Sequence, residues 1–410
     1  MKNKYTSKLF FVLCVISLIS CTQKETNPQN NSNQFFTIDF AEIIKNKNEV
    51  PLSEIAKSIE FIQFETTTKS LLGNIMDIKL TKDYIFIHHN GDKRLTQFSR
   101  QGKFIRHIGI VGRGPKEYAL MRTFSLDEKN ELIYIQTNWT RKFLVYNFKG
   151  EYVKTLRFNA VERGMVVWSR DNLLMSFSEP LVGNEPYVFI EHNEKGDTLQ
   201  YVKNYIFWDE SEISDFSRSY WGRNAFYRFD NKLHMKGWYN DTVYTYNDQS
   251  IIAPKYFIDL KDHKIPNELV FERQSTKPLP QNCYWIGVNE TSNYIFIRYA
   301  PHYSRNFDAH SYFNGCVFYN KTTKEGIALI EREKVGFIND ISAGPNFNPL
   351  YTNDTITFVD VTAMDMKLYL DSEEFKNSQP EFPEQKEKLI QLNQTLKEDD
   401  NHFLMVAKLK

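Results

Sequence analysis

Short runs of alternating apolar and polar residues, separated by turn residues, fill most of this chain. Alternation with a period of two is the pattern of a β-strand with one buried face. Four such runs follow one another at 76–80, 84–88, 95–99 and 104–108. A second stretch repeats them at 123–127, 132–136, 142–147 and 152–156, and the apolar positions of the two stretches align when small gaps are allowed. Each stretch therefore predicts an antiparallel sheet of four strands.

A glycine turn recurs before the last strand of these units. Gly102, Gly150 and Gly196 lie about 47 residues apart, and a repeat of about 40 to 50 residues with four strands each is typical of the blades of a β-propeller. Weaker repeats predict further sheets over 165–199, 225–260, 284–330 and 336–362. We therefore predict an all-β fold, a six-bladed β-propeller. Five or seven blades remain alternatives, because the last three units depend on weak periodicity.

Both ends of the folded part predict additional strands. Residues 35–40 and 59–64 precede the first complete unit, and we expect an N-terminal strand to complete the last blade and close the ring, which removes two sheet edges. Residues 402–409 predict a final strand that pairs into the closing blade or packs across the ring. Apolar residues at helical spacing between 364 and 398 predict a short helical segment within the propeller domain, which spans 34–410.

The N-terminal segment 1–21 has the pattern of a processing segment, which is left out of the fold. An apolar run at 9–19 follows the basic residues Lys2, Lys4 and Lys8. The end of this run forms the sequence Leu18-Ile19-Ser20-Cys21 with the two residues after it. This segment resembles bacterial lipoprotein signals, which implies removal of residues 1–20 and acylation of Cys21. Thr22, in place of Asp, implies delivery to the outer membrane, with the folded part facing the periplasm or the cell surface. Residues 21–33 contain the lipidated cysteine and a flexible tether.

Composition narrows the classes of function. The chain has 51 basic residues (Lys plus Arg) and 51 acidic residues (Asp plus Glu), so its net charge is zero. Without a net positive charge, nucleic acid is disfavoured as a partner. Aromatic residues make up 15% of the chain, which favours sheets. Outside the signal segment only Cys283 and Cys316 remain, and we assign them to the first and third strands of one blade. Two strand spacings exceed the reach of a disulfide, so we predict two buried free thiols.

Several motifs carry a resemblance to a known family. They are Gly102-Lys103-Phe104, Ile108-Gly109 with residues 112–118, residues 240–244, and Asp399-Asp400-Asn401. The chain resembles the six-bladed β-propeller lipoproteins of Bacteroidota, which are NHL-like and have no assigned function. His402-Phe403 departs from the Pro and aliphatic residue that commonly follow the Asn in that family. The resemblance implies a fold and a compartment, and it transfers no catalytic residue.

The glycine-rich stretch 109–118 is the first candidate site. It lacks the Lys-Ser/Thr of a phosphate-binding loop and the βαβ context of a dinucleotide fingerprint. Its glycines predict a tight passage between blades, while its charged side chains are candidates to contact an anionic or hydroxylated ligand at the mouth of the channel. Tryptophans in predicted loops add platforms for a sugar ring or a protein, or else fill gaps between blades. The candidate ligand-binding residues are Arg113, Lys116, Glu117, Tyr118, Trp139, Arg141, Trp221 and Trp238.

We predict no catalytic residue, metal site or cofactor. His88 and His89 are neighbours in a strand and point to opposite faces, so they cannot ligate one ion together. His302, His310 and Asp308 leave a metal site open as an alternative. Acidic residues concentrate at predicted turns, which explains them without catalysis.

Three functions remain. The sequence favours a membrane-anchored binding or scaffolding module of the cell envelope, with a glycan or an envelope protein as ligand. The alternative is a propeller-fold lyase or hydrolase that acts on a polysaccharide or peptide at the channel mouth, since such sites are assembled from different blades and leave no linear motif. The third is a structural subunit of an outer-membrane complex.

Overall fold

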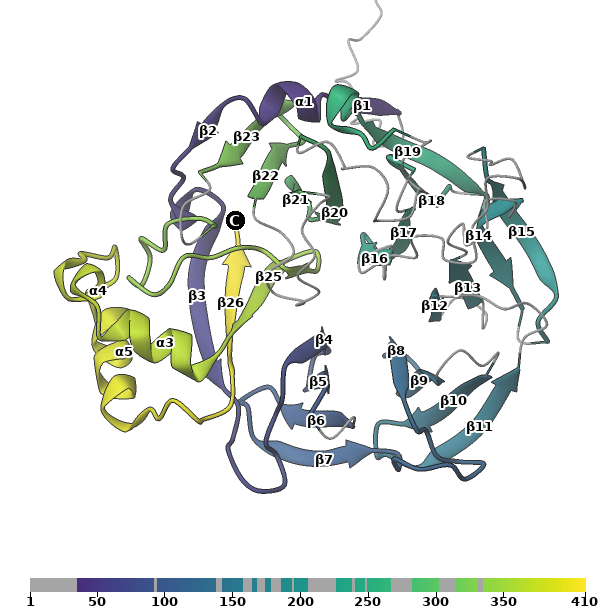
Figure 1. The fold of residues 1–410 in the computed structure, drawn as a ribbon, viewed down its shortest axis with the longest axis horizontal. Helices are drawn as coiled ribbons and strands as arrows, with labels where there is room; N and C mark the ends of the chain where they lie inside the picture. The colour runs from purple at the N-terminus through teal and green to yellow at the C-terminus, as the bar shows by residue number, and fades with distance from the viewer. Residues whose placement is uncertain are drawn as a thin grey trace, which may run out of the picture. The chain divides into compact units, whose positions relative to one another are not determined.

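The computed structural model describes residues 35–91, 94–137, 142–157, 164–167, 174–177, 186–193, 195–205, 226–237, 240–247, 249–266, 282–301, 315–330 and 335–410. Phe35–Lys410 forms a compact unit. Within it the sheets are arranged around a common centre, in the manner of a propeller (Figure 1). The predicted signal segment, Cys21 and the tether lie outside the described residues.

Five sheets each contain four strands that are consecutive in the described chain. The first has β4 (Ile75–Leu80), β5 (Tyr84–His89), β6 (Leu95–Ser99) and β7 (Phe104–Ile108). The second has β8 (Met121–Asp127), β9 (Leu132–Thr137), β10 (Lys142–Asn147) and β11 (Tyr152–Arg157). The third has β12 (Gly164–Val167), β13 (Leu174–Phe177), β14 (Tyr187–His192) and β15 (Thr198–Lys203). The fourth has β16 (Phe226–Phe229), β17 (Lys232–Lys236), β18 (Thr242–Tyr246) and β19 (Ile252–Ile258). The fifth has β20 (Tyr284–Glu290), β21 (Tyr294–Pro301), β22 (Gly315–Asn320) and β23 (Glu325–Leu329).

The sixth sheet joins the two ends of the chain. It contains β24 (Tyr351–Thr352), β25 (Ile356–Val361), β26 (Phe403–Leu409) and β3 (Ala56–Gln63), in that order. β26 lies antiparallel to β3, with Met405 opposite Phe61. The predictions that an N-terminal strand completes the last sheet, and that the C-terminal strand pairs into it, are confirmed.

The N-terminal segment also extends two other sheets. β1 (Phe36–Ile38) pairs in parallel with β19, and β2 (Lys47–Asn48) pairs in parallel with β23. The fourth and fifth sheets therefore have five strands. The predicted count of six blades is not confirmed: five sheets are regular units, and the sixth is a composite whose β24 is very short. Such short parallel pairings leave too little periodicity to be read from the sequence.

Turn glycines fix the outer strands, as predicted. Gly102, Gly150 and Gly196 have φ of 80°, 82° and 85°, a region in which residues with a Cβ are strained. The Gly102 turn also packs on the end of β3, where a Cβ would collide with the carbonyl oxygen of Gln63. Substitution of Gly102 would thus disturb the contact between the first and sixth sheets.

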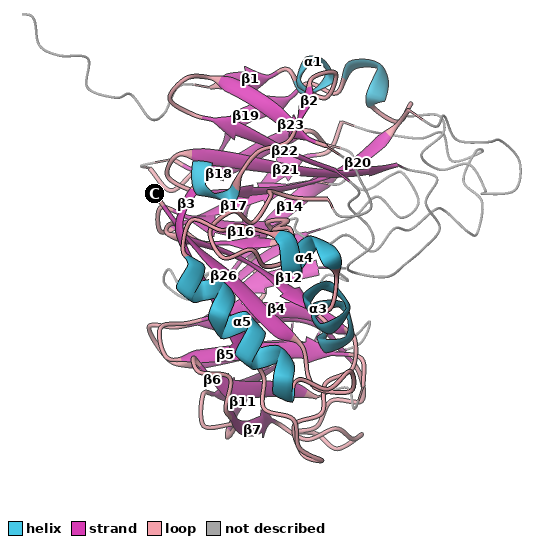
Figure 2. Ribbon diagram, turned by 90° about the vertical axis from the view of Figure 1, so that its left-hand side faces the viewer, coloured by secondary structure: helices cyan, strands magenta, loops and turns pink. Residues whose placement is uncertain are grey.

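The outer side of β3 and β26 carries α3 (Ala363–Leu370), α4 (Glu373–Asn377) and α5 (Pro383–Thr395) (Figures 1 and 2). The described residues also form α1 (Phe40–Ile43), which contacts β23, and 3-10 turns at Leu52–Glu54 and Lys261–His263. Met366, Phe375 and Leu389 bury their side chains in one cluster with Phe403 and Met405 of β26. The predicted helical segment is confirmed. None of the helices in the described residues is long and apolar enough to cross a membrane.

The two cysteines of the folded part are free and buried, as predicted. Cys283 directly precedes β20, and Cys316 lies in β22, the third strand of that sheet. Burial raises the pKa of Cys316 to about 12, although the Arg298 guanidinium opposes the shift. At neutral pH this thiol is protonated and unreactive.

Candidate functional site

The ring has two unlike faces because the strands of each sheet alternate in direction. One set of strand ends carries short turns, at 81–83, 100–103, 128–131, 148–151, 193–197, 230–231, 247–251, 291–293, 321–324 and 353–355. Residues 168–173, which join β12 and β13 on that side, lie outside the described part. We name this side the turn face. The opposite ends carry the long connections, among them 64–74, 109–120, 204–225, 259–283 and 362–402. We name that side the connection face.

On the turn face, polar contacts cross the centre of the ring. Arg228 of β16 donates a hydrogen bond to the carbonyl oxygen of Leu126 in β8 at 2.8 Å, past the intervening third sheet. Burial raises the pKa of Glu128, the Arg228 guanidinium opposes this shift, and the backbone N–H of Lys82 in the first sheet also donates to the Glu128 carboxylate. The backbone N–H of Asp230 donates to Asp354 of the sixth sheet at 2.8 Å. The contacts of Arg228 with Leu126 and of Asp230 with Asp354 join sheets that are not neighbours, whereas the contact of Lys82 with Glu128 joins the neighbouring first and second sheets.

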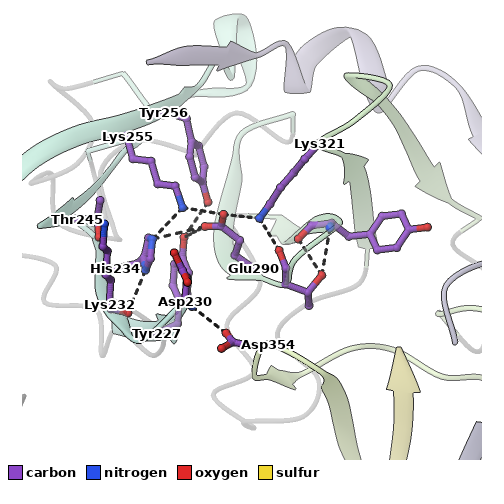
Figure 3. Close-up of polar contacts among 12 residues, drawn as sticks. Tyr227, Asp230, Lys232, His234, Thr245, Lys255, Tyr256, Glu290, Lys321 and Asp354 are labelled. Carbon is purple, nitrogen blue, oxygen red and sulfur yellow. Dashed lines mark hydrogen bonds and ion pairs between the residues drawn. The ribbon is translucent and has the colours of Figure 1, made fainter. Parts of the chain in front are cut away.

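A buried charged cluster lies between the fourth and fifth sheets (Figure 3). The Glu290 carboxylate, at the end of β20, accepts from Lys255 at 2.8 Å and forms an ion pair with Lys321 at 2.7 Å. The Tyr227 hydroxyl lies 3.0 Å from the second carboxylate oxygen and 2.9 Å from the Tyr256 hydroxyl. We call Glu290, Lys255, Lys321, Tyr227, Tyr256 and His234 the Glu290 cluster.

The hydrogen bonds of His234 fix its tautomer. The Lys255 ammonium can only donate, so the 2.9 Å contact makes the imidazole Nε2 an acceptor. Nδ1 then carries the proton and donates to the carbonyl oxygen of Lys232. Burial and the Lys255 ammonium lower the pKa of His234 to about 3. His234 is therefore neutral, and its 3.8 Å approach to Glu290 is not an ion pair.

The two ammonium groups of the cluster keep the buried Glu290 carboxylate charged. Burial alone would raise the pKa of Glu290, but the ammonium groups of Lys255 and Lys321 hold it below its usual value. Both ammonium groups also face the ring of Phe229, at 4.9 Å and 3.9 Å from its centroid, an arrangement in which the aromatic face attracts the cation.

The cluster contains a carboxylate, two ammonium groups and an imidazole, as an acid-base site does, but its carboxylate and imidazole are buried. The Glu290 side chain is 1% exposed, so no substrate reaches the carboxylate without displacing its partners. Its contacts join β16, β17 and β19 to β20 and to the turn after β22. We conclude that the Glu290 cluster fastens the fourth sheet to the fifth. The sequence did not predict this cluster, because its residues are dispersed between positions 227 and 321.

The predicted site at 109–118 is a compact inter-sheet connection. The backbone N–H of Gly114 donates to the Glu117 carboxylate at 2.8 Å, and a Cβ on Gly112 would collide with the same carboxylate. Tyr118 is buried, and its hydroxyl donates to the carbonyl oxygen of Ile108 at 2.7 Å. The carbonyl oxygen of Lys116 accepts from the Tyr146 hydroxyl at 2.6 Å. These contacts support the predicted tight passage between the first and second sheets.

Two predicted ligand-binding residues of this connection remain exposed on the connection face. They are Arg113 and Lys116, and the Lys116 ammonium lies over the Tyr152 ring. Glu117 and Tyr118 instead have the structural contacts described above. Trp139, Arg141, Trp221 and Trp238 lie outside the described residues, as do His302, Asp308 and His310. Among the residues that are described, no group of three metal-ligating side chains is assembled.

A second feature of the connection face was not foreseen, although one of its residues belongs to a recognised motif. Asn401 is buried and binds the connection between β3 and β4. Its side-chain oxygen accepts from the N–H of Leu72 at 2.8 Å, and its side-chain nitrogen donates to the carbonyl oxygens of Glu65 at 2.7 Å and Ser70 at 2.8 Å. Its own N–H donates to Thr66 at 2.9 Å. The Asn of the C-terminal motif therefore fixes a loop that belongs to the N-terminal part of the chain.

Comparisons with known proteins agree with this architecture. The family described as "Domain of unknown function (DUF4934)" matches residues 35–408. No curated protein matches this chain. A solved structure described as a "putative exported protein" from Bacteroides fragilis covers 92% of this chain and 100% of its own, with 16% identity and a TM-score of 0.64. A member of the DUF4221 family from Bacteroides vulgatus covers 89% and 99%, with 12% identity and a TM-score of 0.47. At such identities the first of these matches shows a common fold alone.

Proposed function

We propose that this chain, which belongs to the DUF4934 family over residues 35–408, is a lipid-anchored binding or scaffolding module of the bacterial cell envelope that recognises its partner with the connection face. A propeller-like fold and an exported neighbour of the same fold support a binding or scaffolding role in general. The lipid anchor on Cys21, the outer-membrane location and a glycan or envelope protein as ligand are the specific parts of the proposal. We also propose that each of the six sheets acts as one blade.

The asymmetry of the two faces carries this proposal. Functional residues of repeat folds are concentrated on loops that a rigid scaffold positions. The turn face has short turns and is crossed at its centre by Arg228, whereas the long connections at 204–225, 259–283 and 362–402 leave the other face. Among the described candidates, Arg113 and Lys116 are exposed on the 109–120 connection of this face.

Paired charge variants of the full-length lipoprotein test the proposal. One carries Arg113→Ala with Lys116→Ala on the connection face, and the matched control carries Lys82→Ala with Lys129→Ala on the turn face; all four side chains are exposed. A second set replaces Trp139, Trp221 and Trp238 by Ala. Binding to purified envelope glycans and to outer-membrane proteins is measured in detergent. We expect weaker binding in the connection-face variants and unchanged binding in the control. Equal binding by all variants, or loss in the control alone, would refute the assignment.

A further inference from the structure

A hollow of about 680 Å³ lies at the edge of the first sheet, between the 64–74 connection and β7. This volume is in the range of small-molecule sites. We name it the rim hollow. Its lining residues are Thr68, Lys69, Leu71, Leu72, Gly73, Gly91, Arg94, Phe104 and His107.

The loop that forms one wall is held rigidly. Asn401 binds it at four points, as described above. The Ser70 hydroxyl donates to the carbonyl oxygen of Glu65 at 2.6 Å and contacts the Thr67 hydroxyl at 2.8 Å. A loop fixed in this way loses little conformational entropy when a ligand binds.

A directed chain of hydrogen bonds joins this wall to the sheet. The N–H of Gly73 donates to Nδ1 of His89 at 3.1 Å, so the Nε2–H of that neutral ring can donate to the Thr96 hydroxyl at 3.3 Å. The Thr96 hydroxyl can then donate to Nδ1 of His107 at 3.1 Å, and the Nε2–H of His107 donates to the carbonyl oxygen of Lys69 at 2.9 Å. This series of hydrogen bonds begins at a backbone donor, the N–H of Gly73, and ends at a backbone acceptor, the carbonyl oxygen of Lys69. His89 and His107 are therefore both held as the Nε2–H tautomer.

The side chains of this rigid wall remain available to a ligand. Leu71 is 58% exposed. A ligand that covers this aliphatic side chain would remove apolar surface from water, which favours binding. Lys69 is exposed, and among the described residues its ammonium group has no hydrogen-bond or ion-pair partner. Arg94 also lines the hollow, and none of the described residues that line it is acidic. Charge and apolar surface together favour a ligand that has a carboxylate next to an aliphatic group.

We propose that the rim hollow binds the C-terminus of a peptide that ends in an aliphatic residue. The terminal carboxylate would face the Lys69 ammonium, and the last side chain would cover Leu71 and Leu72. A sugar fits this lining less well, since Phe104, the one Phe, Tyr or Trp among the described lining residues, already packs against Phe98 and His107. The proposal rests on the connection face as the binding face and specifies a ligand class for it.

Peptide binding to the full-length protein in detergent tests this ligand class. Fluorescein-labelled pentapeptides that differ only in their last residue are prepared with a free C-terminal carboxylate and, in parallel, as C-terminal amides; an oligogalacturonate is the third probe. Dissociation constants are measured by fluorescence polarisation. We expect peptides that end in Leu, Ile or Val to bind, and amidation to weaken binding at least about tenfold, because a hydrogen bond to a charged group contributes about 1.5 to 3 kcal/mol. Equal binding of the amides, no peptide binding, or preferred binding of the oligogalacturonate would overturn the proposal.

Matched variants locate the binding site. Leu71→Ser is compared with Leu199→Ser, since Leu199 is 52% exposed on β15, and Lys69→Gln is compared with Lys129→Gln on the turn face. We expect the variants at 69 and 71 to lose affinity about tenfold and the controls to be unchanged, with all four equally stable because these side chains are exposed. Unchanged affinity in both rim variants would overturn the site. If envelope binding depends on Arg113 and Lys116 while no peptide binds, this ligand assignment fails and the proposed function stands. If envelope binding is insensitive to the connection face, the proposed function itself fails.

Discussion

Substitution of Glu290 by Gln should destabilise the protein by about 3 kcal/mol at pH 7, because breaking a buried ion pair by removing one partner costs about 3 to 5 kcal/mol. Glutamine has nearly the same shape, so packing is kept, but the negative charge between Lys255 and Lys321 is lost. We place the cost at the lower end because the side chains of Lys255 and Lys321 are 18% and 20% exposed and keep part of their hydration.

The effect should depend on pH in a defined direction. The pKa of Glu290 in the folded protein lies below its usual value, so its stabilisation is present above the pKa of the unfolded chain, about 4.3, and is lost as the pH falls through the folded value. The difference between the wild-type protein and Glu290→Gln should therefore be largest at neutral pH and decrease below about pH 4.

Urea denaturation followed by circular dichroism at pH 7 and at about pH 3 measures this difference. Glu60→Gln is the matched control, because Glu60 is exposed on β3 and makes no polar side-chain contact with the described residues. Two results would refute the role of the Glu290 cluster in holding the fourth and fifth sheets together. One is that Glu290→Gln and Glu60→Gln are equally stable at pH 7. The other is that the stability difference between the wild-type protein and Glu290→Gln does not change with pH.

Three further predictions follow from buried polar groups and turns. His234 has a pKa lowered to about 3, so the unfolded chain binds a proton between about pH 3 and 6.5 that the folded chain does not. Stability should rise with pH across that window by about 1.4 kcal/mol per unit, and His234→Asn should flatten the slope in denaturation curves. Asn401→Ala removes three side-chain hydrogen bonds and should destabilise by about 2 to 3 kcal/mol, with faster hydrogen exchange at 65–72; unchanged exchange would contradict its role. Gly102→Ala should destabilise by more than about 1 kcal/mol through its positive φ and its contact with Gln63. The same change at Gly150, which has a similar φ but no atom closer than 3.4 Å to the added Cβ, should cost less in thermal unfolding.

The regular four-stranded units could be predicted because the strands that pair in them are neighbours in the sequence. In the first sheet, β4 to β7 follow one another without interruption over 75–108, and one buried face imposes the period of two. The positive φ of Gly102, Gly150 and Gly196 is also a local property that the sequence displays. Ring closure was predictable for a different reason: two strands without a complete unit of their own remained, one at each end of the chain.

The sites could not be predicted because their residues are brought together by the ring. The partners of Glu290 come from positions 227 to 321, and none of them forms a motif with its sequence neighbours. Asn401 stood in a recognised motif, yet its role depends on a loop at the opposite end of the chain. The sequence predicted that the glycine-rich connection is a tight passage between blades. It did not predict that Glu117 and Tyr118 form hydrogen bonds within this connection and with the end of β7.

Hydrogen exchange of the full-length protein with and without its bound partner tests the central claim most directly. The account predicts that binding slows exchange on the connection face, at 64–74 and 109–120, and leaves the turns at 128–131 and 321–324 unchanged. Protection confined to those turns would contradict it, because the partner would then bind the turn face, where Arg228 contacts Leu126.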